Sequence, residues 1–173
     1  ESIQAAINGA DSNDTISIQS GVYRESLNIS KTINLIGIGR PLLDGGAINS
    51  AIILQADGVS VSEFDIRTTR RTGIYVRSNN NIIYNNTISG CLDGIRLDYS
   101  RSNRISNNDI NNNTNGITLY ASERNIIANN SVRDNNINEE SDCGIFLAYS
   151  KDNVIVNNDL SNNGDTSLSL RSA

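Results

Sequence analysis

The fold is decided by residues 73–165, which repeat one pattern four times. The stretch reads GIYVRSNNNIIYNNTISGCLD (73–93), GIRLDYSRSNRISNNDINNNTN (94–115), GITLYASERNIIANNSVRDNNINEESDC (116–143) and GIFLAYSKDNVIVNNDLSNNGD (144–165). The Gly-Ile pairs begin at Gly73, Gly94, Gly116 and Gly144, so successive offsets are 21, 22 and 28 residues. The longest unit carries an insertion at residues 137–142. A repeat of this length predicts an array of stacked units.

Each unit has the period of short strands. Apolar residues alternate with other residues after each glycine, as at Ile95 and Leu97, and two further apolar positions follow, as at Ile105 and Ile110. Three strands joined by polar corners make one coil of roughly 22 residues, which can bury a core only by stacking in parallel on neighbouring coils about 4.8 Å away. The sequence therefore predicts an all-β fold, a right-handed parallel β-helix of about seven to eight coils.

Doubled asparagines occupy one position of every unit. They are Asn85-Asn86, Asn107-Asn108, Asn129-Asn130 and Asn157-Asn158. We expect the first of each pair at a corner with positive φ, which Asn tolerates better than other non-glycine residues. The second lies in phase with the inward Ile two residues later, so its amide should point inside and bond to the Asn above and below. Phe64 takes this position one coil earlier and should end the amide ladder there.

The 173 residues predict a single domain in three parts. Residues 1–12 are expected to form a helical cap, 13–72 the irregular first coils, and 73–173 the regular Asn-rich coils. The cap should cover the open end of the first coil, because a bare end exposes core and unpaired strand edges. Its apolar face is formed by Ile3, Ala6, Ile7 and Ala10.

The residues at both ends of the chain lead us to expect that the natural protein extends beyond them. Glu1 begins abruptly inside the predicted helix, which is typical of a trimmed N-terminus. Residues 167–173 match the start of another Gly-Ile strand, and no C-terminal cap is recognisable. We therefore expect truncation at the C-terminus, with further coils or self-association through this end.

Composition excludes several classes of function. A net charge of −5 and a pI near 4.7 argue against nucleic acid as a partner. No apolar run approaches the length of a membrane span. The chain has no His, which removes Ser-His-Asp triads, Cys-His pairs and HExxH zinc sites.

The chain resembles a known superfamily. The N-terminal segments SIQAAINGA, DTISI, GVYRESLNISKTINLIGIG and LLDGG, followed by the Asn-rich coils, resemble pectin-lyase-like β-helix proteins, most closely the NosD-like members and related archaeal cell-surface repeat proteins. The resemblance covers nearly the whole chain and implies an exported protein, extracellular, at the cell surface or periplasmic. It is specific for fold and weak for function, because this fold carries lyases, hydrolases, adhesins and structural repeats.

The name NosD implies copper handling, but the sequence lacks the usual donors. It contains neither His nor Met. Cys91 and Cys143 fall two coils apart, near 10 Å by coil stacking, which is beyond disulfide reach and unsuited to a shared metal site. We therefore expect two unpaired thiols and no copper site.

Several charged positions have a structural explanation. Asp109 and Asp159 share one column, but Ser131 separates them on an outward face, so we interpret them as surface charge. Opposite charges should also stack on one side of the tube, where they form exposed ion pairs. These columns are Arg101, Glu123 and Lys151, and next to them Ser102, Arg124 and Asp152.

One outward face is a candidate ligand site. The outward positions of the Gly-Ile strands gather aromatic rings and an Arg-Asp-Arg cluster, and sugar rings pack well on aromatic faces. The predicted ligand-binding residues are Tyr75, Arg77, Arg96, Asp98, Tyr120 and Phe146. Thr118 and Ala148 share this face, with Tyr99 and Tyr149 just beyond it. In polysaccharide lyases of the superfamily the substrate groove and calcium site occupy the equivalent strand and flanking loops, so the resemblance points to the same strip.

Two function classes are consistent with these patterns. The first is a noncatalytic, exported β-helical module with a structural or adhesive role, which binds carbohydrate. The second is a calcium-assisted lyase acting on an acidic polysaccharide, with Arg96 or Arg77 as base beside Asp98. Calcium would then be held by Asp134, Glu139, Glu140 and Asp142. The small number of loop insertions favours the first class.

Overall fold

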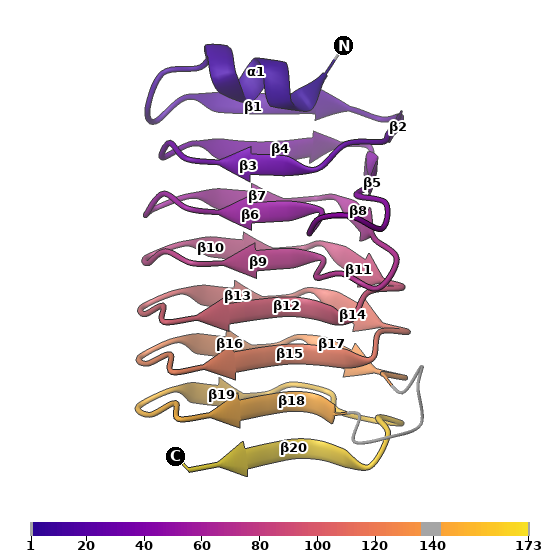
Figure 1. The fold of residues 1–173 in the computed structure, drawn as a ribbon, viewed down its shortest axis with the longest axis vertical. Coiled ribbons are helices and arrows are strands. Elements are labelled where there is room, and N and C mark those ends of the chain that lie inside the picture. The colour runs from indigo at the N-terminus through magenta and orange to yellow at the C-terminus, as the bar shows by residue number, and fades with distance from the viewer. Residues whose placement is uncertain (1, 136–142, 173) are drawn as a thin grey trace.

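The computed structural model describes residues 2–135 and 143–172, and these form a parallel β-helix with one short helix. Coils are stacked along one axis, with the helix at one end and the last strand at the other (Figure 1). Every strand pairs in parallel with strands of the adjacent coils. In most cases the partner is the third strand along the chain, so β1 pairs with β4 and β4 with β7. The predicted fold class is confirmed, with about seven turns of roughly 22 residues.

Three sheets run the length of the tube. Sheet A contains β1 (Thr15–Gln19), β4 (Asn34–Ile38), β7 (Ser60–Ser62), β10 (Ile82–Tyr84), β13 (Arg104–Ser106), β16 (Ile126–Ala128) and β19 (Val154–Val156). Sheet B contains β2 (Val22–Tyr23), β5 (Leu42–Asp44), β8 (Asp65–Arg67), β11 (Thr87–Ser89), β14 (Asp109–Asn111) and β17 (Ser131–Arg133). Sheet C contains β3 (Leu27–Ile29), β6 (Ile52–Leu54), β9 (Ile74–Val76), β12 (Asp93–Asp98), β15 (Asn115–Tyr120), β18 (Cys143–Ala148) and β20 (Thr166–Arg171).

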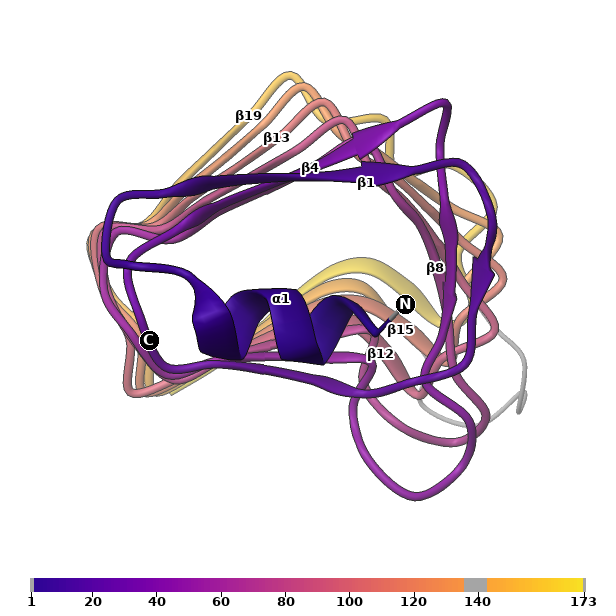
Figure 2. The same cartoon turned by 90° about the horizontal axis from the view of Figure 1, so that it is seen from above.

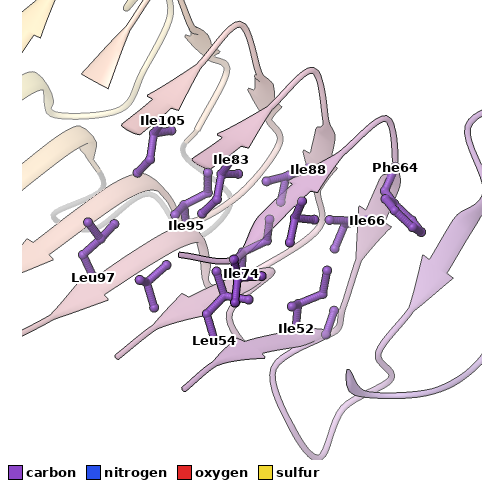
Figure 3. Close-up of a cluster of buried hydrophobic side chains, with 14 of the residues drawn as sticks. Ile52, Leu54, Phe64, Ile66, Ile74, Ile83, Ile88, Ile95, Leu97 and Ile105 are labelled. Carbon is purple, nitrogen blue, oxygen red and sulfur yellow. The ribbon is translucent and has the colours of Figure 1, made fainter. Parts of the chain in front are cut away.

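The core is a narrow column of aliphatic side chains. Most strands of sheets A and B are three residues long and bury chiefly the middle one, because successive side chains point to opposite faces. Ile83, Ile105 and Ile127 therefore lie in register in adjacent coils of sheet A and are fully buried. Figure 3 shows side chains from all three sheets meeting inside the tube, among them Ile88 of sheet B and Ile95 of sheet C.

The glycine that begins each repeat is explained by close packing between sheets B and C. A Cβ on Gly94 would lie 2.5 Å from a methyl carbon of Ile110 and 2.7 Å from the carbonyl oxygen of Gly116. A Cβ on Gly116 would meet Val132 and the Gly144 carbonyl at similar distances. The position is therefore restricted to glycine by lack of space.

The predicted asparagine ladder is confirmed. The first Asn of each pair has positive φ, with values of 56° at Asn85 and 57° at Asn107. The second is buried at Asn86, Asn108 and Asn130 and partly buried at Asn158, and the Asn108 side chain links three coils. Its Oδ1 accepts from the backbone N–H of Asn86 at 3.0 Å, and its Nδ2 donates to Oδ1 of Asn130 at 3.0 Å. The same contacts continue from Asn130 to Asn158.

Two further ladders were not predicted. The inward amides of Asn81, Asn103, Asn125 and Asn153 form one between sheets C and A, and those of Asn113, Asn135 and Asn163 form another after sheet B. All three corners of a regular coil therefore carry stacked amides. Serine does the same: the backbone N–H of Ser100 donates to the Ser122 hydroxyl oxygen, and that of Ser122 donates to the Ser150 hydroxyl oxygen. The ladder groups thus satisfy one another without water.

Phe64 ends the predicted ladder, as expected. Its ring is fully buried, and its backbone N–H donates to Oδ1 of Asn86 at 3.1 Å. The coils before it are held instead by aliphatic side chains and by Arg40, which spans the corner between sheets A and B. The Arg40 guanidinium donates to the Asp65 carboxylate at 2.9 Å and to the Thr87 hydroxyl at 2.6 Å.

The cap is shorter than predicted. Helix α1 spans Ile3–Gly9 and lies across the end of the tube (Figure 2). Only Ile3 and Ile7 are buried on it, whereas Ala6 is exposed, so the apolar face is narrower than the sequence indicated. α1 contacts both β1 and β3, and Ala6 borders an open hollow next to β1 instead of packing into the core.

Glu25 fixes the start of α1. Its carboxylate accepts from the backbone N–H groups of Ile3 and Gln4 and from the Ser2 hydroxyl, at 2.8, 3.0 and 2.7 Å. Partial burial alone would raise the pKa of Glu25. The hydrogen bonds from Gln4, Ile3 and Ser2 outweigh it, so the pKa of Glu25 lies below its ordinary value.

The last strand confirms the expectation that residues 167–173 begin another Gly-Ile strand. β20 pairs in parallel with β18, with Leu168 opposite Ile145 and Leu170 opposite Leu147. Within the described residues, β19 and β20 end sheets A and C, and Leu170 is 61% exposed.

Replacing one rung of the ladder should destabilise the fold. Asn108→Ala removes the acceptor of the Asn86 backbone N–H and the donor to Asn130, leaving buried groups without partners. We expect the free energy of unfolding, measured with urea, to fall by about 2–4 kcal/mol. The control is Asn107→Gly, at an exposed corner with φ of 57°, which should change stability by less than about 0.5 kcal/mol. Equal effects of the two substitutions would contradict the ladder's role.

Candidate functional site

The candidate site lies on the outer face of sheet C. We call it the ligand strip, formed by Tyr75, Arg77, Arg96, Asp98, Tyr120 and Phe146. Register places Arg96 between Tyr75 and Thr118 of the adjacent coils, and Asp98 next to Tyr120. Thr118 in turn lies next to Phe146. The structure therefore brings all the predicted residues to one face over four consecutive coils.

A polar network fixes the centre of the strip. The Tyr75 hydroxyl donates to Oδ2 of Asp98 at 2.7 Å, and Nε of Arg96 donates to Oδ1 of the same carboxylate at 3.0 Å. Arg96 also lies 3.6 Å from the carboxylate of Asp93, which accepts from the Thr118 hydroxyl at 2.7 Å. The network spans three coils and holds each of these side chains in one orientation.

Asp93 was missed by sequence reasoning. Its side chain is only 4% exposed, and Arg96 and Thr118 are partners of its carboxylate. The coil register places it opposite Asn115, whose amide donates to it at 3.2 Å. Asp93 occupies the position before the repeat glycine, which is held elsewhere by Thr72, Asn115 and Cys143. Because the residue at this position differs from repeat to repeat, the sequence did not indicate that a charge is buried beneath the strip.

The network determines the charge state of the strip. Burial of Arg96 would lower its pKa, but its hydrogen bond to Asp98 and the charges of Asp98 and Asp93 raise it above the ordinary value. For Tyr75, burial acts in the other direction and raises the pKa, and the hydrogen bond to Asp98 raises it further. Arg96 is therefore a permanent cation and Tyr75 a neutral hydrogen-bond donor. Two carboxylates surround one guanidinium, so the centre of the strip carries no excess positive charge.

Aromatic rings flank the network. The Tyr120 ring meets Tyr99 and Tyr149 edge to face, each at a centroid distance of 5.6 Å. The Arg171 guanidinium lies 5.8 Å from the Phe146 ring centre, and that of Arg77 lies 5.9 Å from the Tyr75 ring centre. These are the distances of cation–π contacts. The strip thus presents rings whose positions are fixed by neighbouring coils.

The predicted calcium ligands are only partly described. Glu139, Glu140 and Asp142 lie outside the described residues. The fourth, Asp134, lies at a corner with φ of 55°, and its carboxylate is 3.1 Å from the Arg133 guanidinium. Within residues 2–135 and 143–172 there is no group of three or more His, Cys, Asp or Glu side chains placed to hold a metal ion.

The predicted charge columns are confirmed only in part, because among the described residues Glu123 and Lys151 form the one ion pair between stacked coils in them. Arg101 and Glu123 are neighbours in register, and the Glu123 carboxylate lies 3.8 Å from Lys151 and 3.7 Å from Arg124. Glu123 thus pairs with cations of its own coil and the next one rather than with Arg101. Asp109 and Asp159 are separated by Ser131, as the sequence indicated.

Both cysteines are buried as free thiols, as predicted. The Cys91 thiol donates to the Ser89 carbonyl at 3.3 Å and the Cys143 thiol to the Ile145 carbonyl at 3.1 Å. Burial raises the pKa of Cys91 to about 12 and raises that of Cys143 as well. Neither sulfur is available as a thiolate near neutral pH.

The three-sheet tube, its amide ladders and its solvent-facing strip define a parallel β-helix protein of the pectin-lyase-like superfamily. The family described as periplasmic copper-binding protein (NosD) matches residues 4–172, nearly the whole chain. The chain belongs to this family. No curated protein matches it. The described residues contain no helix with the length and apolar character needed to cross a membrane.

The residues of this chain do not fit a copper site. Cu(I) prefers thiolate and thioether ligands and Cu(II) prefers imidazole, yet the sequence has no His and no Met. The two thiols are protonated and buried in separate places, and each already donates to a backbone carbonyl. Only hard oxygen donors remain, which bind copper weakly and without selectivity.

Copper binding can be measured directly. We expect the purified chain, incubated with Cu(I) under reducing conditions or with Cu(II) and then desalted against a chelator, to retain far less than one copper per chain by elemental analysis. The Cys91→Ser and Cys143→Ser variants should give the same result. One equivalent of copper that survives the chelator and is lost in either variant would show that a thiol opens to the metal.

Proposed function

We propose that the chain is a noncatalytic, exported β-helical module with a structural or adhesive role at the cell surface, and that it binds carbohydrate on the ligand strip. Membership of a family described as periplasmic supports export. The rigid stack of coils supports a structural role, because each coil is bonded to its neighbours by sheet pairing and amide ladders.

The observation that carries carbohydrate binding is the construction of the strip itself. Aromatic rings and hydrogen-bonding groups alternate along one exposed face at the spacing of the coils, roughly 4.8 Å. Sugars present C–H faces that pack on aromatic rings and hydroxyls that bond to carboxylates and guanidinium groups. Tyr120 and Phe146 supply partly exposed rings, and Asp98 and Arg96 supply the polar groups.

The charge state of the strip supports binding rather than catalysis. A lyase base must be able to lose its proton, whereas the pKa of Arg96 lies above its ordinary value. Asp98 is held by Arg96 and Tyr75, so its carboxylate is committed to the network. The strip is thus organised to keep its shape and not to transfer protons.

Binding should depend on the strip. We expect calorimetric titration with oligosaccharides identified on a glycan array to show at least about tenfold weaker binding for Tyr120→Ala, through loss of the ring. Tyr75→Phe, which removes only the hydroxyl donor to Asp98, should weaken binding less. The matched control is Arg67→Ala, which breaks the exposed pair with Asp44 on sheet B and should leave binding unchanged.

Three outcomes would contradict the proposal. An Arg96→Ala protein that stays folded and keeps full binding to every glycan that the parent binds would remove the strip as the site. Unsaturated product detected in the ultraviolet, after calcium and an acidic oligosaccharide are added, would replace the noncatalytic module with a lyase. A parent protein that binds no glycan would remove carbohydrate as the ligand.

A further inference from the structure

A second surface feature borders the ligand strip, at the corner where the chain leaves sheet C and enters sheet A. In three consecutive coils this corner begins with Tyr99, Ala121 and Tyr149, and all three have positive φ, at 51°, 46° and 52°. A bulky residue in this region is a conformational outlier that costs free energy. The tyrosines gain no burial in return, since Tyr99 is 73% and Tyr149 58% exposed. Such an outlier points to a surface role.

The corner tyrosines form a continuous aromatic ridge. Tyr120, the last residue of β15, lies between them and meets each ring edge to face, with interplanar angles of 80° to Tyr99 and 81° to Tyr149. We call Tyr99, Tyr120 and Tyr149 the tyrosine ridge. It runs parallel to the tube axis over three coils, and edge-to-face contact holds each ring in place.

A hollow of about 390 Å³ opens next to the ridge. It is lined by Asn79, Tyr99, Ser100, Arg101, Ala121 and Glu123. Ala121 occupies the corner position that carries tyrosine in the coils on either side, and its small side chain leaves space at this level. The volume falls in the range of small-molecule sites, roughly 300–1,000 Å³. It is large enough for one sugar ring with its substituents.

The hollow is lined by one arginine, Arg101. Glu123 is engaged by Lys151 and Arg124, and the Asn79 amide donates to the Asp57 carboxylate. Within the described residues, no carboxylate oxygen lies within 4.0 Å of the Arg101 guanidinium, although the protein as a whole carries a net charge of −5. An arginine and a tyrosine that line the same hollow are suited to a ring that carries an anionic group.

We propose that this hollow is a subsite for an acidic sugar, in which the Tyr99 ring packs against the C–H face of the sugar and Arg101 pairs with its carboxylate or sulfate. The inference rests on the proposed carbohydrate binding and adds a place and a charge preference that the ligand strip lacks. Tyr99 and Tyr149 are two coils apart, roughly 9.6 Å along the axis. An extended glycan lying along the ridge therefore contacts both rings.

The test compares three oligosaccharides of equal length: an oligouronate, a sulfated oligosaccharide and a neutral one. Tyr99→Asn removes the ring but keeps a residue that tolerates positive φ, so this variant should fold at least as stably as the parent. Arg101→Gln removes the charge alone. We expect each variant to bind the preferred acidic oligosaccharide at least about tenfold more weakly. Arg101→Gln should also abolish the preference for acidic over neutral chains, and the two acidic ligands distinguish carboxylate from sulfate.

The matched control is Arg104→Gln, an exposed arginine of the same coil outside the hollow, which should change binding less than about twofold. If Tyr99→Asn and Arg101→Gln bind like the parent while Tyr120→Ala does not, the corner subsite is wrong and the ligand strip stands. Equal binding of neutral and acidic chains by the parent would overturn the charge preference. Tighter binding of a single-stranded oligonucleotide through the same two residues would overturn the ligand class.

Discussion

Buried asparagine amides hold the coils of this protein in register. An amide inside a ladder accepts from the backbone N–H of one neighbouring coil and donates to the amide oxygen of the other, as Asn108 does between Asn86 and Asn130. A net hydrogen bond in a protein contributes only about 1 kcal/mol, but a single missing rung leaves several buried groups without partners. The ladders therefore act mainly by specifying register. A coil shifted by one residue would place the inward Asn86 opposite the outward Asn107 or Asp109 and leave both neighbours unsatisfied.

The narrow core explains why the candidate function lies outside the tube. A strand of three residues sends mainly its middle side chain inward, and aliphatic residues and amides fill that space. The identity of the outward and corner residues can then vary from coil to coil, while the spacing between coils stays fixed. The ligand strip uses the outward positions of sheet C, whereas the tyrosine ridge uses a corner at which Tyr99 and Tyr149 have an unfavourable backbone conformation. The same scaffold thus orders both surfaces through strand register and corner geometry.

Period and phase were enough to predict most of the fold. The coil, the Gly-Ile strands, the Asn86–Asn108–Asn130 column and the role of Phe64 all came from counting residues between repeats. The ladder through Asn113 was not predicted, because in the run from Asn111 to Asn113 composition does not show which amide points inward. Asp93 was not predicted, because its partners are Arg96 of its own coil and Thr118 of the next coil. The contacts of the tyrosine ridge depend on ring orientation, which no sequence pattern encodes.

The most direct test of the ladders is hydrogen exchange of side-chain amides, followed by NMR. In each doubled pair the first asparagine serves as an internal reference for the second, since Asn107 and Asn129 are exposed while Asn108 and Asn130 are buried. The account predicts that the Nδ2 protons of Asn108 and Asn130 exchange at least about a thousandfold more slowly than those of Asn107 and Asn129. Equal exchange rates within each pair would contradict it, because a ladder amide cannot be bonded on both sides and open to water.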